Sequence, residues 1–195
     1  MVAARNLARL TAAALMIVAC NKKENSAADT TAAASDTSAT ASSTTSETWT
    51  DENIFALLDE ANAADSAAGA IAATKGTSAA VRDFGKRMMR DHHALRVQGE
   101  VLAKKLKVTP TPPAGDNSMA DSQKSLDTLN STAKGKDFDK AYIDHEVEVH
   151  KAVLETATKA MSQAQSTELK NLIQKAAPVI QGHLDKVEAI QKNLK

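Results

Sequence analysis

Beyond about residue 50, hydrophobic residues recur every three or four positions, which is the spacing of one buried face of an α-helix. Three segments show this spacing regularly. The first face consists of Ile54, Leu58, Ala61, Asp65, Ala68 and Ala72. The second consists of Val81, Gly85, Met88, His92, Leu95, Gly99, Leu102 and Leu106. The third consists of Leu169, Ile173, Ala176, Ile180, His183, Val187, Ile190 and Leu194. The pattern predicts amphipathic helices that pack through these faces.

A further helix, with a less regular pattern, is predicted over about residues 137–162. Tyr142, Glu146 and His150 share one of its faces because they are four residues apart. Each of the four predicted helices therefore carries a polar side chain near the middle of its apolar face. If the helices pack together, Asp65, His92, Glu146, His150 and His183 fall in roughly one central layer, where helical bundles build metal sites.

Residues at the ends of the first two helices fit helix caps. Thr50 and Ser78 are good N-caps, and the first helix is expected to reach about Thr74, before Gly76. The second helix is expected to end near Lys107, because three prolines follow within residues 109–113.

The connection over residues 108–136 is too long for a tight turn between helices. Met119, Leu126 and Leu129 predict a short helix within it. Such a crossover lets the second and third long helices run parallel, as in ferritin-like bundles. The last helix begins after Ser166 or Thr167 and contains Pro178, where a kink is expected. The predicted fold is therefore all-α, a ferritin-like four-helix bundle over residues 49–195.

The N-terminus is predicted to be a lipoprotein export signal. Arg5 and Arg9 precede a short apolar stretch that ends in Ile17-Val18-Ala19-Cys20, which resembles a bacterial lipobox. Residues 1–19 would be the signal peptide and Cys20, the single cysteine of the chain, the lipidated residue. By resemblance to lipoprotein sorting, Asn21 after the cysteine favours the outer membrane, facing the periplasm.

Between this signal and the first helix, residues 20–48 are rich in Ala, Ser, Thr and Asp and contain almost no large apolar side chain. Such a segment is expected to be a disordered linker, because it cannot bury enough surface to offset its ordering entropy. The membrane, reached through the lipid, is the one partner predicted. A net charge of zero and 3% aromatic residues give no sign of nucleic-acid binding.

Two interpretations of the polar layer remain open. Imidazole and carboxylate groups can bind a transition-metal ion, with ligands Asp65, His92, Glu146, His150 and His183. The same side chains could instead form a hydrogen-bonded network that includes Tyr142, since buried polar groups need partners. No catalytic residue is predicted.

Two metal-binding motifs of known enzymes are not matched by this sequence. His145 and His150 are five positions apart, so they do not make the zinc-protease pair, whose histidines return to one helix face. The Glu-x-x-His pairs of di-iron proteins are missing, because Met89 and Ile180 stand three residues before His92 and His183. His93 and His145 are predicted to face solvent.

Three short motifs resemble a known family. They are Met89-Arg90-Asp91-His92, Phe138-Asp139-Lys140-Ala141-Tyr142 leading to His150, and Pro178 followed by His183-Leu184. The chain resembles, over about residues 50–193, an exported bacterial family that is ferritin-like in fold and catalogued as domain of unknown function 4142. The resemblance implies a ferritin-like bundle without an established activity. A glutamate often stands in that family where this chain has Asp65.

Three functional hypotheses follow. The first is a cell-envelope lipoprotein, tethered through Cys20, with a non-enzymatic role in envelope maintenance or stress. The second is a metal-binding or metal-dependent redox protein that uses the central layer. The third is a helical interaction module, for which no large exposed apolar stripe is evident.

Overall fold

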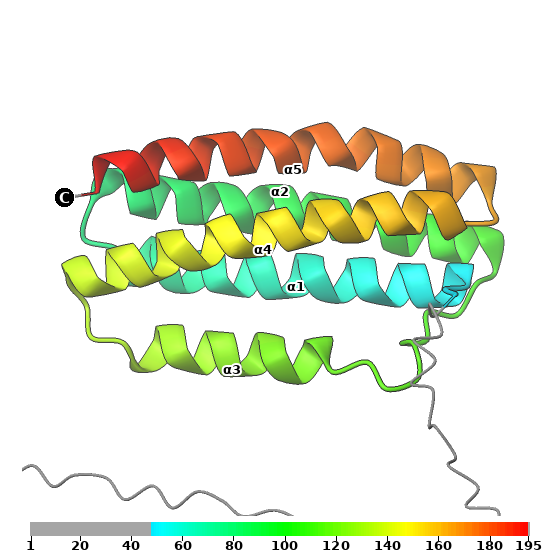
Figure 1. The fold of residues 1–195 in the computed structure, drawn as a ribbon, viewed down its shortest axis with the longest axis horizontal. Coiled ribbons are helices and arrows are strands. Elements are labelled where there is room, and N and C mark those ends of the chain that lie inside the picture. Colours follow the sequence, from blue (N-terminus) through cyan, green and yellow to red (C-terminus); the bar gives the residue numbers. More distant parts are fainter. Residues whose placement is uncertain (1–47, 195) are drawn as a thin grey trace, which may run out of the picture. The chain divides into compact units, whose positions relative to one another are not determined.

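The computed structural model describes residues 48–194. The predicted signal peptide, Cys20 and nearly all of the predicted linker therefore lie outside the described residues. Within them the chain forms α-helices and no strand. The helices are α1 (Asp51–Lys75), α2 (Ala79–Leu106), α3 (Ser118–Ser131), α4 (Lys136–Gln163) and α5 (Thr167–Asn193), shown in Figure 1. The prediction of an all-α fold is confirmed.

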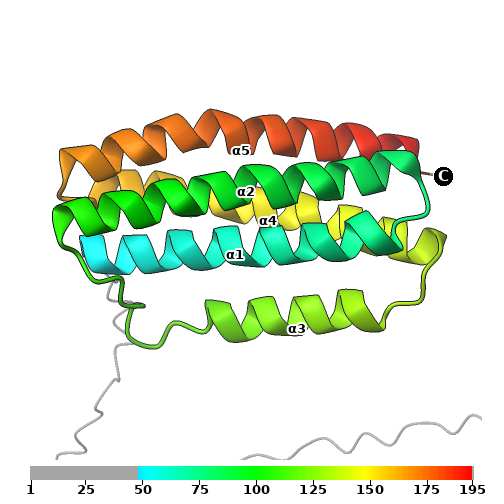
Figure 2. The same ribbon diagram turned by 180° about the vertical axis from the view of Figure 1, so that it is seen from behind.

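The four long helices lie side by side, and α3 lies along the outer side of α1 (Figures 1 and 2). Helix α1 packs most extensively against α2, and α4 against α5, while α1 also touches α4 and α2 also touches α5. The colours of Figure 1 show that α3 carries the chain back along the domain, so that α2 and α4 run in the same direction. None of the described helices is long and apolar enough to cross a membrane.

Local sequence determines the helix ends. Thr50 forms a capping box with Asn53, and the hydroxyl groups of Ser78 and Ser166 accept hydrogen bonds from backbone N–H groups in the first turns of α2 and α5. Lys107 ends α2 in the left-handed conformation, at φ 58°. Helix α5 continues through Pro178. The observed ends lie within one or two residues of the predicted ones.

The turn between α1 and α2 is held by a carboxylate from α4. Asp139 is 2% exposed and accepts three hydrogen bonds, from the Thr77 backbone N–H (2.8 Å), the Thr77 hydroxyl (2.6 Å) and the Ser78 backbone N–H (2.8 Å). Hydrogen bonds to an ionised acceptor are stronger than those between neutral groups. Asp139, which belongs to one of the family-like motifs, therefore has a structural role.

Helices α1 and α2 touch through their backbones at two glycines. A Cβ atom on Gly69 would lie 2.6 Å from the carbonyl oxygen of Gly85, and one on Gly85 would lie 2.6 Å from the carbonyl oxygen of Gly69. This contact fixes the register of the antiparallel pair. One turn before Gly69 stands Asp65, and two turns after Gly85 stands His92, so the contact brings these two side chains together.

Two apolar clusters fill the interior, one toward each end of the domain. The first includes Val81, Phe84, Phe138, Ile143 and Val187, and the second includes Ile54, Phe55, Ala160, Leu169 and Ile173. In α1, α2 and α5 the buried polar residue stands between the residues of the two clusters in sequence, and in α4 His150 does so. The polar layer therefore separates two ordinary hydrophobic cores.

Candidate metal centre

The five residues predicted for the polar layer are all buried. Asp65, His92, Glu146, His150 and His183 come from four helices, and none is more than 1% exposed. Two overlapping groups form, and both include His150. The first group contains one ring nitrogen from each of His92, His150 and His183, and these three atoms lie within 4.8 Å of one another. The second group contains one carboxylate oxygen each of Asp65 and Glu146 and one ring nitrogen of His150, and these atoms also lie within 4.8 Å of one another.

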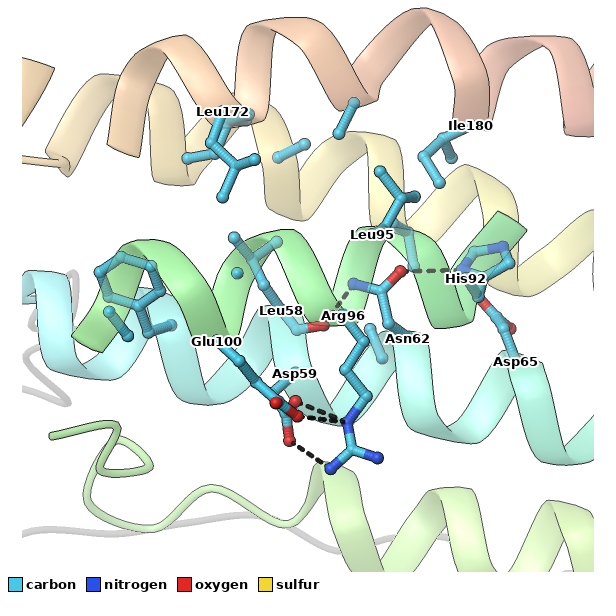
Figure 3. A pocket seen from close by; sticks show the side chains of 18 of the residues that line it. Leu58, Asp59, Asn62, Asp65, His92, Leu95, Arg96, Glu100, Leu172 and Ile180 are labelled. Carbon is cyan, nitrogen blue, oxygen red and sulfur yellow. Dashed lines mark hydrogen bonds and ion pairs between the residues drawn. The ribbon is translucent and has the colours of Figure 1, made fainter. Parts of the chain in front are cut away.

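The tautomer of His92 follows from its neighbour Asn62. The Asn62 side-chain amide donates to the carbonyl oxygen of Leu58 at 2.6 Å, so its oxygen faces His92 Nδ1, at 2.9 Å (Figure 3). An amide oxygen can only accept, which places the ring hydrogen on Nδ1. The lone pair of His92 is therefore on Nε2.

The other two rings are fixed in the same way. His150 Nδ1 lies 2.8 Å from the backbone carbonyl oxygen of Glu146, one turn earlier in α4, and that oxygen can only accept. His183 Nε2 lies 3.0 Å from a carboxylate oxygen of Asp91. Partial burial raises the pKa of Asp91, but the His183 hydrogen bond and neighbouring arginines outweigh it, so the pKa lies below its usual value. The lone pairs are therefore on His150 Nε2 and His183 Nδ1.

These three lone pairs have no donor. Among the described residues, His92 Nε2, His150 Nε2 and His183 Nδ1 are buried and have no hydrogen-bond partner. The ring centroids lie 5.2–5.5 Å apart, with two pairs edge-to-face at 82° and 77° and the third tilted at 43°. Three buried acceptors without a donor are costly. The hydrogen-bonded network considered as the alternative therefore does not satisfy these rings.

Burial also keeps the imidazoles neutral. Desolvation, assisted by the other rings, lowers the pKa of His92 to about 3, and desolvation lowers the pKa of His150 to about 4. Burial lowers the pKa of His183 as well. Because the unfolded chain binds more protons between these values and about 6.5, the histidines reduce stability as the pH falls through that range. At neutral pH the rings are in the form that binds metals.

The carboxyl groups are shifted in the opposite direction. Burial raises the pKa of Asp65 to about 7, and burial with the nearby Asp65 raises the pKa of Glu146 well above its usual value. Both Glu146 oxygens, one Asp65 oxygen and the Tyr142 hydroxyl are buried without a hydrogen-bond partner among the described residues. Burial is the main cause that raises the pKa of Tyr142, and the adjacent Glu146 raises it further. A cation beside these carboxyls would favour their ionised forms.

The remaining histidines lie outside the centre. His93 is exposed, as predicted. The prediction that His145 faces solvent is wrong, because this ring is half-buried and its pKa is lowered by desolvation. Met88 is fully buried in an apolar cluster, as expected of a core residue.

Sequence reasoning missed the two side chains that orient the rings. Asn62 stands three residues before Asp65, on the same side of α1, and this spacing could have indicated it. Asp91 directly precedes His92 in the sequence but serves His183, on α5. No local pattern links residues 92 positions apart, so only the packing of α2 against α5 reveals that pair.

Comparisons with known proteins bear on the fold. The sequence profile of the family described as "Domain of unknown function (DUF4142)" matches residues 26–190. A solved structure, described as "Crystal structure of DUF305 fragment from Deinococcus radiodurans", is similar in fold, with a TM-score of 0.64 and 11% sequence identity. The similarity covers 73% of this chain and 95% of that one. No curated protein sequence matches the chain significantly.

Proposed function

The chain belongs to the DUF4142 family, whose function is unknown. From the geometry of the site we propose that the domain binds a transition-metal ion. The ligands are His92, His150 and His183. One observation carries the proposal: three buried imidazoles each bring one ring nitrogen within 4.8 Å of the others, and the ring nitrogens that carry their lone pairs have no donor among the described residues. A Lewis acid is the partner that satisfies all three at once.

The surroundings support this proposal. Each proposed ligand donates its other ring N–H to an oxygen, from Asn62, the Glu146 backbone or Asp91. Such bonds orient metal-binding histidines and increase their basicity. A set of neutral imidazoles suits zinc, copper, nickel or iron, which is the range proposed.

Asp65 and Glu146 complete the proposed centre. Because their oxygens lie near His150, one of them can supply a further ligand or accept a proton from a bound water. The missing Glu-x-x-His pairs argue against a di-iron centre of the ferritin type. The proposal is therefore a histidine-rich centre that binds a single ion, and no reaction is assigned to it.

Metal analysis tests the proposal. Residues 45–195, which form one compact unit, would be purified and titrated with Zn²⁺, Cu²⁺ and Co²⁺. The parent is expected to bind one ion, and the His92→Ala/His183→Ala variant at least about 100-fold more weakly, since two of three ligands are lost. His93→Ala removes an exposed histidine from the same helix and should leave the affinity unchanged.

Two outcomes would overturn the metal centre. One is a parent protein that binds no ion in the titration. The other is equal affinity of the parent and the double variant, which would place the ion elsewhere. Unfolding measurements on the metal-free proteins show whether the double variant is folded, so that lost binding is not mistaken for lost structure.

We further propose that this domain is a ferritin-like four-helix bundle carried by an envelope lipoprotein with a role in envelope maintenance or stress. Four long helices with a central polar layer support the ferritin-like assignment. The support for the anchor is the sequence around Cys20, an apolar stretch that ends in a lipobox-like motif. An outer-membrane location, facing the periplasm, is part of the same proposal and rests on Asn21.

A cysteine substitution tests the anchor. Cys20→Ser in the full chain is expected to move the protein from the membrane fraction to the soluble fraction of a Gram-negative host, because the lipid can no longer be attached. Mass spectrometry of the parent should show a diacyl or triacyl cysteine at its N-terminus. An unmodified Cys20, or a Cys20→Ser protein that stays in the membrane fraction, would refute the lipid anchor.

A further inference from the structure

A cavity of about 180 Å³ lies beside the candidate metal centre. Its walls are mainly apolar and come from all four long helices. They include Phe55, Leu58, Leu95, Leu172, Ile173 and Ile180. Figure 3 shows the cavity with its lining side chains. A buried apolar cavity of about 150 Å³ is large enough to bind benzene, so this one can hold a molecule of similar size.

The inner end of the cavity reaches the metal centre. Asp65 and His92, both 1% exposed, line it, together with Asn62, which orients His92. Figure 3 shows these three side chains grouped at one end. A molecule in the cavity would therefore lie against one proposed ligand and one carboxyl of the centre.

Small residues create the space. Gly99 on α2 and Ala176 on α5 line the cavity at positions of the apolar faces where larger residues would be expected to fill a core. A Cβ atom on Gly99 would meet nothing within 4 Å. The contrast with Gly69 and Gly85 is informative, since those glycines allow close contact whereas Gly99 leaves space.

Charged side chains line one side of the cavity (Figure 3). Arg96 forms a two-point ion pair with Asp59, at 2.7 Å from Nε to Oδ1 and 3.2 Å from Nη2 to Oδ2. Glu100 lies 3.7 Å from Arg96, and all three side chains are at least 37% exposed. Two carboxylates and one guanidinium give this side of the cavity a charge of −1. An anion would be repelled there and would find apolar walls inside.

From this arrangement we infer that the cavity binds a small, neutral, largely apolar molecule with a single polar group, and holds that group against the metal centre. The apolar walls provide the binding energy, and the negatively charged side disfavours anions. Asp65 offers the polar contact at the inner end, beside the ring of His92. The contact with a bound ion rests on the proposed function, whereas the binding of the molecule to the cavity does not.

Binding of phenol to the metal-free domain tests the cavity. Phenol is neutral and of suitable size, and benzoate is its anionic counterpart. By calorimetry or ligand-detected NMR, phenol is expected to bind, and benzoate at least about tenfold more weakly. Gly99→Leu and Ala176→Leu should each weaken phenol binding at least about tenfold by filling the space.

Gly182→Leu is the matched control. Gly182 is an exposed helical glycine that also leaves its Cβ position open, but it does not line the cavity. Phenol binding should be unchanged in this variant. The inference is overturned if phenol does not bind the parent, if both cavity variants bind it as the parent does, or if benzoate binds equally well.

A second measurement tests the contact with the metal. In the Co²⁺-loaded domain, phenol should change the visible absorption spectrum, and Gly99→Leu should abolish that change while the spectrum without phenol stays the same. Phenol binding with an unaltered spectrum would overturn the contact. If no ion binds at all, the proposed function fails, yet phenol binding by the metal-free domain still shows the cavity site.

Discussion

Asp65→Asn is expected to make the metal-free domain more stable at pH 8, by an amount on the order of 4 kcal/mol. Burial raises the pKa of Asp65 from 3.8 to about 7. Between these values the folded protein keeps a proton that the unfolded chain releases, so stability falls as the pH rises through this range. Asparagine has the same shape and no charge to lose, so it avoids this penalty.

Urea unfolding in the presence of a chelator, at pH 4 and pH 8, measures this effect. The parent and Asp65→Asn should have nearly equal free energies of unfolding at pH 4, and the difference should grow toward pH 8. Asp139→Asn is the control, because it replaces a buried carboxylate that accepts three hydrogen bonds and should destabilise the protein. A destabilised Asp65→Asn at pH 8 would contradict the assigned protonation.

Gly85→Ala should destabilise the domain by about 3 kcal/mol, although alanine is the better helix former. The added Cβ would lie 2.6 Å from the Gly69 carbonyl oxygen, 2.8 Å from the Ala73 backbone nitrogen and 3.0 Å from the Ala72 Cβ. Two of these atoms belong to the backbone of α1, so α1 and α2 must move apart. Thermal and urea unfolding of the metal-free proteins measure the loss.

Gly182→Ala is the natural comparison. It makes the same chemical change in an exposed position of α5, where a Cβ meets nothing within 4 Å. This variant should gain up to about 1 kcal/mol from helix propensity alone. Equal effects of the two substitutions would show that the helices adjust at no cost and that the glycine contact does not fix their register.

The sequence alone was sufficient to predict the helices and the polar layer, because both depend on local patterns. Ser78 and Ser166 cap helices where their side chains predict caps. The three-and-four spacing identifies Asp65, His92 and His183, and the four-residue spacing in the less regular helix identifies Glu146 and His150. Because each of these polar residues stands near the middle of its helix, packing of the four helices places them at one level of the bundle. The exact partners of each side chain do not follow from such patterns.

The features that were missed depend on distant pairs. Gly85 was recognised as part of an apolar face, but its contact with Gly69 depends on how α1 lies against α2. His145 turned out half-buried because neighbouring side chains cover it, which a helical projection cannot show. The pairing of Asp91 with His183 and the cavity beside His92 likewise arise only from packing.

The protonation states of the layer also determine how metal uptake is coupled to protons. The imidazoles are already neutral at pH 7, so their coordination would release no proton into the buffer. A buried carboxyl that enters the coordination sphere must first lose its proton, and Glu146 holds that proton well above its usual pKa. The number of protons released per ion, read from binding enthalpies in buffers of different ionisation heat, would therefore count the carboxyl groups that ionise when the ion binds.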